Sequence, residues 1–185
     1  MKTCQVYFTG TSPYSASRAH QSEKLPKETA DAYEERTWRN KAHIEKGRVV
    51  VPAMGFKMGL DRAVKMLGRQ IPGKGKSTYT KFFESGVIVT NNVPIAPEAA
   101  ISCERIHANA DGIRGSGKRV WRNFPRVDEW AGVVEFYVIA DEVTKDIFEE
   151  AARYAGLAVG VGRFRPERGG FFGRYTVDKF VWSEV

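Results

Sequence analysis

The spacing of apolar residues changes several times along this chain of 185 residues, and these changes limit its possible folds more than any other feature. Apolar and polar residues alternate over 4–8 and 134–140, which predicts two half-buried strands, and a short apolar run predicts a strand at 87–89. Apolar residues at helical spacing predict a helix over 53–67, ending at Gly68, and a second helix after Thr144. A last strand is expected over 172–182.

This order of elements (strand, helix, strand, strand, helix, strand) predicts an α+β fold of the ferredoxin-like (RRM-like) type, with a split β-α-β sheet. Two further short strands are expected at 49–51 and 157–161. A chain of this length has room for one domain. We expect a single domain, 1–185, with insertions at about 10–47, 69–85 and 107–131.

The net charge of +7, from 29 basic and 22 acidic residues, is unevenly spread along the chain. Seven basic residues and one acidic residue lie within 57–81. Five basic and no acidic residues lie within 114–126, and four arginines accompany one glutamate within 160–175. Acidic residues gather instead at 28–35 and 141–150. This separation predicts one face that attracts phosphate groups.

No apolar run approaches the roughly 20 residues that a membrane helix needs, and the first residues have no apolar segment of signal-peptide length. We therefore expect a soluble, cytoplasmic protein with no membrane partner. Two cysteines, Cys4 and Cys103, and three scattered histidines lack the paired spacing of a zinc site. The sequence thus predicts neither a metal site nor a cofactor.

The strongest local signal is the glycine-rich segment 160–174. Its glycines let backbone amides approach a phosphate, its arginines offer forked donors, and its phenylalanines can stack on bases. The alternative is a hairpin loop with solvated arginines and with the phenylalanines in the core. The residues predicted to bind nucleic acid here are Gly162, Arg163, Arg165, Arg168, Gly169, Gly170, Phe171 and Arg174.

Two further basic segments are predicted to contact nucleic acid. The segment 115–122 contributes Lys118, Arg119, Trp121 and Arg122, and its alternative is a surface turn with Trp121 as a core residue. The segment 69–85 is expected to be an exposed, lysine-rich thumb that contributes Lys74 and Lys76, with Lys57 ahead of it; its alternative is a solvated loop. A P-loop is disfavoured, because Gly75 stands where magnesium needs Ser or Thr.

Two parts of the sequence resemble the RAMP superfamily, the ferredoxin-like RNA-binding proteins of CRISPR systems. The late helix followed by 157–163 and 169–174 is similar to the glycine-rich loop that precedes the last strand in that family. The segment 49–57, in which Pro52 separates a strand from a helix, is similar to the turn that leads into the first helix of backbone-forming RAMP subunits. The resemblance covers 49–67 and 133–182.

The resemblance implies a non-catalytic protein that binds single-stranded RNA or DNA, with RNA expected. Several copies are expected to line up on the strand as a homo-oligomer, with CRISPR-type protein subunits as further partners. A phage or mobile-element origin stays open.

Two other functions also stay open: a metal-independent RNA endonuclease of RAMP type, and a phage factor that mimics a CRISPR subunit and interferes with host complexes. The endonuclease would use a histidine as general acid or base, for which His20, His43 and His107 are the candidates. None of them stands in a recognisable partner motif, so we assign no catalytic residue.

Overall fold

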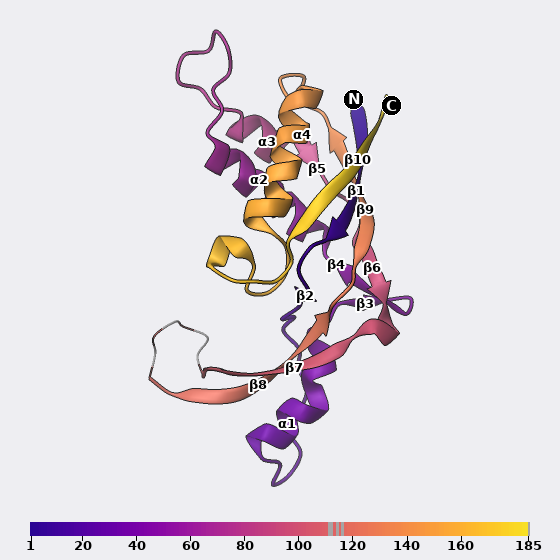
Figure 1. Cartoon of the computed structure of the whole chain (residues 1–185), viewed down its shortest axis with the longest axis vertical. Coiled ribbons are helices and arrows are strands. Elements are labelled where there is room, and N and C mark those ends of the chain that lie inside the picture. The colour runs from indigo at the N-terminus through magenta and orange to yellow at the C-terminus, as the bar shows by residue number, and fades with distance from the viewer. Residues whose placement is uncertain (111–112, 114, 116, 185) are drawn as a thin grey trace.

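The computed structural model describes residues 1–110, 113, 115 and 117–184. At its centre is a four-stranded antiparallel sheet of β1 (Lys2–Gly10), β5 (Val87–Ile88), β9 (Ala131–Val138) and β10 (Tyr175–Glu184) (Figure 1). The strand order is β10-β1-β9-β5, so the first and last strands of the chain pair with each other. Cys4, Val6 and Phe8 of β1 are buried, as the alternating pattern over 4–8 predicts.

Two long helices cover one face of this sheet: α2 (Ala53–Leu67) and α4 (Lys145–Tyr154). Phe8 of β1 packs on Phe56 of α2, with 5.1 Å between ring centroids, and Phe136 of β9 packs on Phe148 of α4 at 5.2 Å. Helix α2 ends at Gly68, which has a positive φ of 58° and closes the last turn. Among the described residues, no helix is long and apolar enough to cross a membrane.

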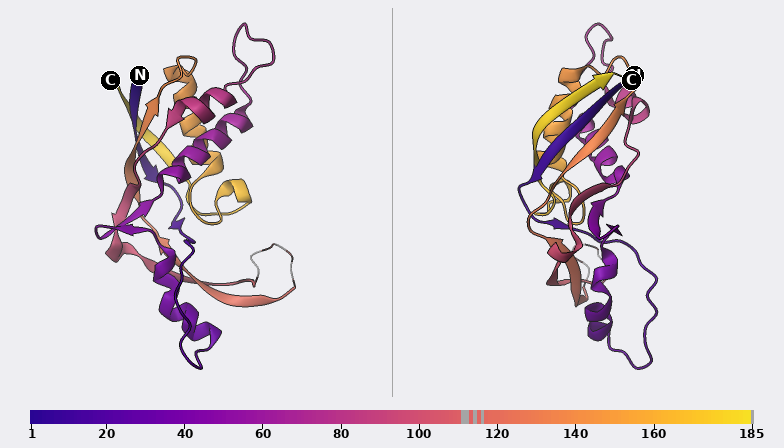
Figure 2. Two further views of the ribbon diagram at one scale, coloured as in Figure 1. Left: turned by 180° about the vertical axis from the view of Figure 1, so that it is seen from behind. Right: turned by 90° about the vertical axis from the view of Figure 1, so that its right-hand side faces the viewer.

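Two smaller antiparallel sheets extend from the central one. The first contains β3 (Ile44–Glu45), β4 (Arg48–Val51) and β6 (Val93–Pro97). The second contains β2 (Tyr14–Ser15) and a long hairpin of β7 (Ser102–Asn109) and β8 (Arg119–Val127). Figure 1 and the left view of Figure 2 show this hairpin leaving the body of the molecule as an arm.

Short helices complete the chain. Helix α1 (Ala30–Thr37) and the 3-10 turn η1 (Trp38–Lys41) lie along β8, at the end of the molecule farthest from the loop between α2 and α3 (Thr80–Gly86) (Figure 1). The remaining turns are η2 (Glu98–Ala100), η3 (Ala155–Val159) and η4 (Pro166–Arg168). In Figures 1 and 2, the loop that carries η4 projects to the same side as the β7–β8 hairpin.

The α+β class, with antiparallel sheets, is confirmed, and both long helices lie where their periodicity predicts them. The strand predicted at 157–161 is wrong, because this segment continues α4 as a π-helical turn that buries Val159. The expected loop at 69–85 ends earlier than predicted, because α3 begins at Thr80 and buries Phe83. The hairpin strands β7 and β8 were not predicted, since many of their side chains are exposed on both faces and leave no clear apolar alternation.

Candidate nucleic-acid interface

Arg163 joins the glycine-rich segment to the base of the hairpin. Its Nη2 donates to Oε2 of Glu104 on β7 at 2.8 Å, and its Nε donates to Oγ of Ser15 at 3.0 Å. Its guanidinium also stacks 4.0 Å from the ring of Phe124 and 4.9 Å from that of Phe172. Only 13% of the side chain is exposed, and this burial lowers the pKa of Arg163, against the opposing effect of Glu104. The structure therefore contradicts the expected exposure of Arg163, and its contact with a phosphate stays a prediction.

The glycines of this segment serve its own packing. A Cβ on Gly162, whose φ is 82°, would overlap the carbonyl oxygen of Ser15, and one on Gly170 would overlap the carbonyl oxygen of Phe164. The amide of Gly169 donates to the carbonyl of Pro166 at 2.8 Å, and that of Gly170 to Arg165 at 3.1 Å. The amides of Gly169 and Gly170 are therefore not free, as we had expected them to be, and phosphate binding by this segment stays a prediction.

Several other side chains of the segment remain on the surface. Arg165 pairs with Glu167 at 2.9 Å, and Glu167 also pairs with Arg62 of α2, so the loop is tied to that helix. Arg168 has no ion pair within the described part of the chain, and the guanidinium of Arg174 donates to the carbonyl of Leu157 at 3.1 Å. Large exposed apolar side chains lie beside these cations: Phe171 is 55% exposed and Phe164 is 51% exposed, whereas Phe172 is buried.

The hairpin brings its own cations to this side of the molecule. Lys118 and Arg119 are exposed, and neither pairs with a carboxylate among the described residues. Trp121 is 47% exposed, and its ring lies 5.0 Å from the ring of His107 and 5.0 Å from the guanidinium of Arg105. Trp121 is therefore a surface residue and not the core residue of the alternative interpretation. Arg114 lies outside the described residues.

Arg122 has a second role, because it takes part in a buried network with Glu34 of α1. Oε1 of Glu34 accepts from Arg122 at 2.7 Å, and Oε2 accepts from Lys41 at 2.6 Å and from the amide of Asn123 at 3.0 Å. Burial raises the pKa of Glu34, but these hydrogen bonds outweigh burial and hold it below its usual range. The network attaches α1 and η1 to the edge of β8.

The lysine-rich segment lies apart from the hairpin: the loop between α2 and α3 is at one end of the long axis in Figure 1, and α1 is at the other. Lys57 is buried on α2, where it pairs with Asp61 and donates to the carbonyl of Phe83 at 2.9 Å, so it is not a surface contact. Lys76 is exposed and without an ion pair in the described chain, while Lys74 pairs with Glu142 at 3.3 Å. A cleft of about 680 Å³ lies here. Its lining includes Lys74, Lys76, Ser77, Thr78, Lys81 and Phe82.

The three histidines do not form a catalytic arrangement with one another. His20 contacts Ser22 at 2.8 Å and stacks on Tyr33, while His107 lies against Trp121 on the hairpin. Burial and the charge of Arg18 lower the pKa of His43. Among the residues that the structure describes, no group of three His, Cys, Asp or Glu side chains could hold a metal ion.

Sequence reasoning missed the two glutamates that hold the interface together. Glu34 belongs to an acidic run that reads as a solvated helix face, and Glu104 lies in a strand that was not predicted. Their positions have no local signal, because their partners come from distant parts of the chain: Glu104 is 59 residues from Arg163, and Glu34 is 88 residues from Arg122.

A solved structure has a similar fold. Cmr6 from Pyrococcus furiosus superposes with a TM-score of 0.50 over 96% of this chain and 99% of its own, at 11% sequence identity. The fold is similar to that of Cmr6. A chain of a CRISPR RNA-guided surveillance complex matches more weakly, with a TM-score of 0.40 over 97% of this chain and 68% of that one, at 10% identity. No family model matches the sequence, and no curated protein matches it.

Proposed function

We propose that this protein binds single-stranded RNA through the loop around η4 and the β7–β8 hairpin. The observation that carries the proposal is the joint between Arg163 and Glu104, which brings together two basic segments that are far apart in the sequence. Arg163 is largely buried in this joint, but other cations remain on the surface. These cations are Lys118, Arg119, Arg168 and Arg174.

The fold supports the same assignment. The strand order β10-β1-β9-β5, with α2 and α4 on one face, is the order expected of a ferredoxin-like domain built from two split β-α-β units. We assign the chain to the RAMP type on this basis, together with its likeness to Cmr6, a RAMP-type CRISPR protein. RNA and CRISPR-type subunits are accordingly the partners that we propose, and assembly of several copies along one strand stays a prediction.

A single strand fits this surface better than a duplex. Phe164 and Phe171 are each about half exposed on the loop that carries Arg168, and Trp121 is about half exposed on the face of the hairpin that also carries Arg119. Exposed aromatic rings next to basic residues are typical of proteins that stack unpaired bases while neutralising the backbone, and such bases are available only where the strand is not paired. The open face of the central sheet is a poorer platform, because Lys179 already covers Tyr7 and Glu135 accepts from Gln5 and Tyr137.

Replacing Lys118 and Arg119 together by alanine should weaken RNA binding by a similar factor for all sequences, because these side chains would contact phosphates. Affinity should fall with salt at a slope of roughly −0.7 per phosphate neutralised, and the double variant should reduce that slope by roughly 1.4. Fluorescence anisotropy across a salt series measures both. Lys24 and Lys27, exposed lysines near α1, provide a control of equal charge when changed to alanine. A salt-independent affinity, or an equal loss in the control, would reject the proposal.

The lysine-rich segment should matter only for long strands. Lys74 and Lys76 belong to the loop between α2 and α3, which lies at the end of the molecule opposite α1 and apart from the hairpin (Figure 1). A strand of about 8 nucleotides held at the hairpin is therefore not expected to reach them. Changing both lysines to alanine should therefore weaken binding of a strand of about 40 nucleotides and leave the short one unaffected. An equal loss of affinity for the short and the long strand would mean that the short strand also contacts the lysine-rich segment.

A further inference from the structure

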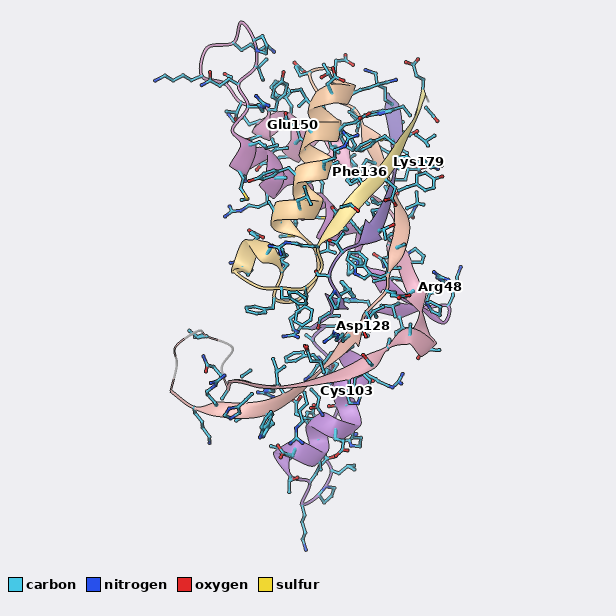
Figure 3. All side chains as sticks on the ribbon, viewed as in Figure 1. Arg48, Cys103, Asp128, Phe136, Glu150 and Lys179 are labelled. Atoms are coloured by element: carbon cyan, nitrogen blue, oxygen red, sulfur yellow. The ribbon has the colours of Figure 1, made fainter. Side chains whose placement is uncertain are left out.

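A second feature of the hairpin lies on the face that carries Trp121. A pocket of about 270 Å³ lies where this face meets α1 and η1. We call it the indole pocket and define it by Asp31, Glu35, Trp38, Arg105, Trp121 and Asn123; Glu34, whose carboxylate is held by Lys41 and Arg122, also lines it. Cys103, which also lines it, is labelled in Figure 3 beside α1. The volume is near the lower end of the roughly 300–1,000 Å³ range of small-molecule pockets, so it suits one ring system.

Asn123 is the least explained residue of this pocket. Its side chain lines the pocket, and the residue is only 8% exposed. Its backbone amide and carbonyl serve the Glu34 network, but within the described residues its side-chain amide has no hydrogen-bond partner. None of the described residues has a buried side-chain nitrogen or oxygen without a hydrogen-bond partner, so the Asn123 amide is open to the solvent in the pocket. It can offer a ligand both a donor and an acceptor.

The charges around the pocket exclude two kinds of ligand. The unpaired carboxylate of Glu35 would repel a phosphate, and Asp31 is the partner of Arg105 at 3.4 Å. Arg105 and Arg119, on the same face of the hairpin, would repel a cationic side chain at the entrance. Neither the carboxylates nor the arginines would repel a flat, neutral ring with N–H donors. It would lie against the indoles of Trp38 and Trp121.

We propose that the indole pocket receives one unstacked base of the bound strand and favours a base with an exocyclic amino group. This inference rests on the proposed function and adds base preference to it. An amino group supplies two N–H donors, one for Oδ1 of Asn123 and one for the Glu35 carboxylate. Uracil has one ring N–H and two carbonyl oxygens. The Glu35 carboxylate repels these oxygens, so uracil cannot donate to both acceptors of the pocket.

The test compares RNA tracts of cytosine and of uracil, each of about 15 nucleotides, on the full-length protein. We expect the wild-type chain to bind the cytosine tract about tenfold more tightly, the factor for one good base contact. Asn123→Ala and Glu35→Gln should each bring the ratio close to one by weakening cytosine binding alone. Glu129→Gln, which changes an exposed carboxylate outside the pocket, should keep the wild-type ratio.

The possible results separate this inference from the proposed function. Salt-dependent binding of both tracts with equal affinity would overturn the base preference and leave RNA binding intact. An equal loss for both tracts in the two pocket variants would also overturn it, since the residues would then support only the hairpin. If neither tract binds, both proposals fail. Should Asn123→Ala not fold, Glu35→Gln decides, because Glu35 is exposed and unpaired in the described chain.

Discussion

Replacing Glu34 by alanine should lower the free energy of unfolding by about 3 kcal/mol, the largest stability loss that we expect from a single substitution. Only 7% of this carboxylate is exposed, and it is the ionic partner of Lys41, itself 11% exposed, and of Arg122. Without it, the buried ammonium of Lys41 keeps only the carbonyl of Asn123 and the ring of Phe124. Denaturant unfolding followed by circular dichroism measures the loss.

Glu129→Ala is the matched control, because it removes an exposed carboxylate without a described partner and should change the free energy of unfolding by less than about 0.5 kcal/mol. Equal stabilities of the two variants would show that the Glu34 network does not hold α1 on the hairpin.

The pH dependence gives the same network a second signature. The pKa of Glu34 is lower in the folded chain than in the unfolded one, so its contribution is fully present above the unfolded value, about 4.3, and is lost as the pH falls through the lower folded value. The difference in stability between the wild type and Glu34→Gln should therefore shrink in acid. An unchanged difference at low pH would assign the effect to packing instead of charge.

Replacing Arg163 by alanine should lower the free energy of unfolding by about 2 kcal/mol, which for a chain of this size corresponds to a fall in Tm of roughly 4–8 °C. The substitution removes the ion pair with Glu104, the hydrogen bond to Ser15 and the stacking on Phe124 and Phe172. Differential scanning calorimetry measures the change. RNA affinity should fall as well, because the loop around η4 loses its attachment to the hairpin.

Arg168→Ala provides the comparison on the same loop. Because Arg168 is exposed and unpaired in the described chain, this substitution should leave Tm unchanged while weakening RNA binding. The reverse outcome, in which Arg163→Ala retains its stability and loses only RNA affinity, would mean that Arg163 contacts the strand directly.

The sequence by itself determined the elements whose signals are local. The helix over 53–67 and its end at Gly68 follow from apolar spacing and a residue that tolerates positive φ, and the helix after Thr144 follows from a capping side chain that accepts from the amide of Ile147. The sequence also determined which segments carry the cations, because the acid-poor stretches are visible without any structure.

Only the tertiary structure decided which of these cations are free. Arg163 and Arg168 are close in sequence and alike in chemistry. Arg163 is largely buried in its ion pair with Glu104, whereas Arg168 is exposed and has no ion pair among the described residues. Likewise, 157–161 has the composition of a strand, but α2 and β10 pack against it and favour a helical turn. A helix or cap depends on neighbours within a few residues, whereas the partner of a charged side chain is set by where distant segments meet in space.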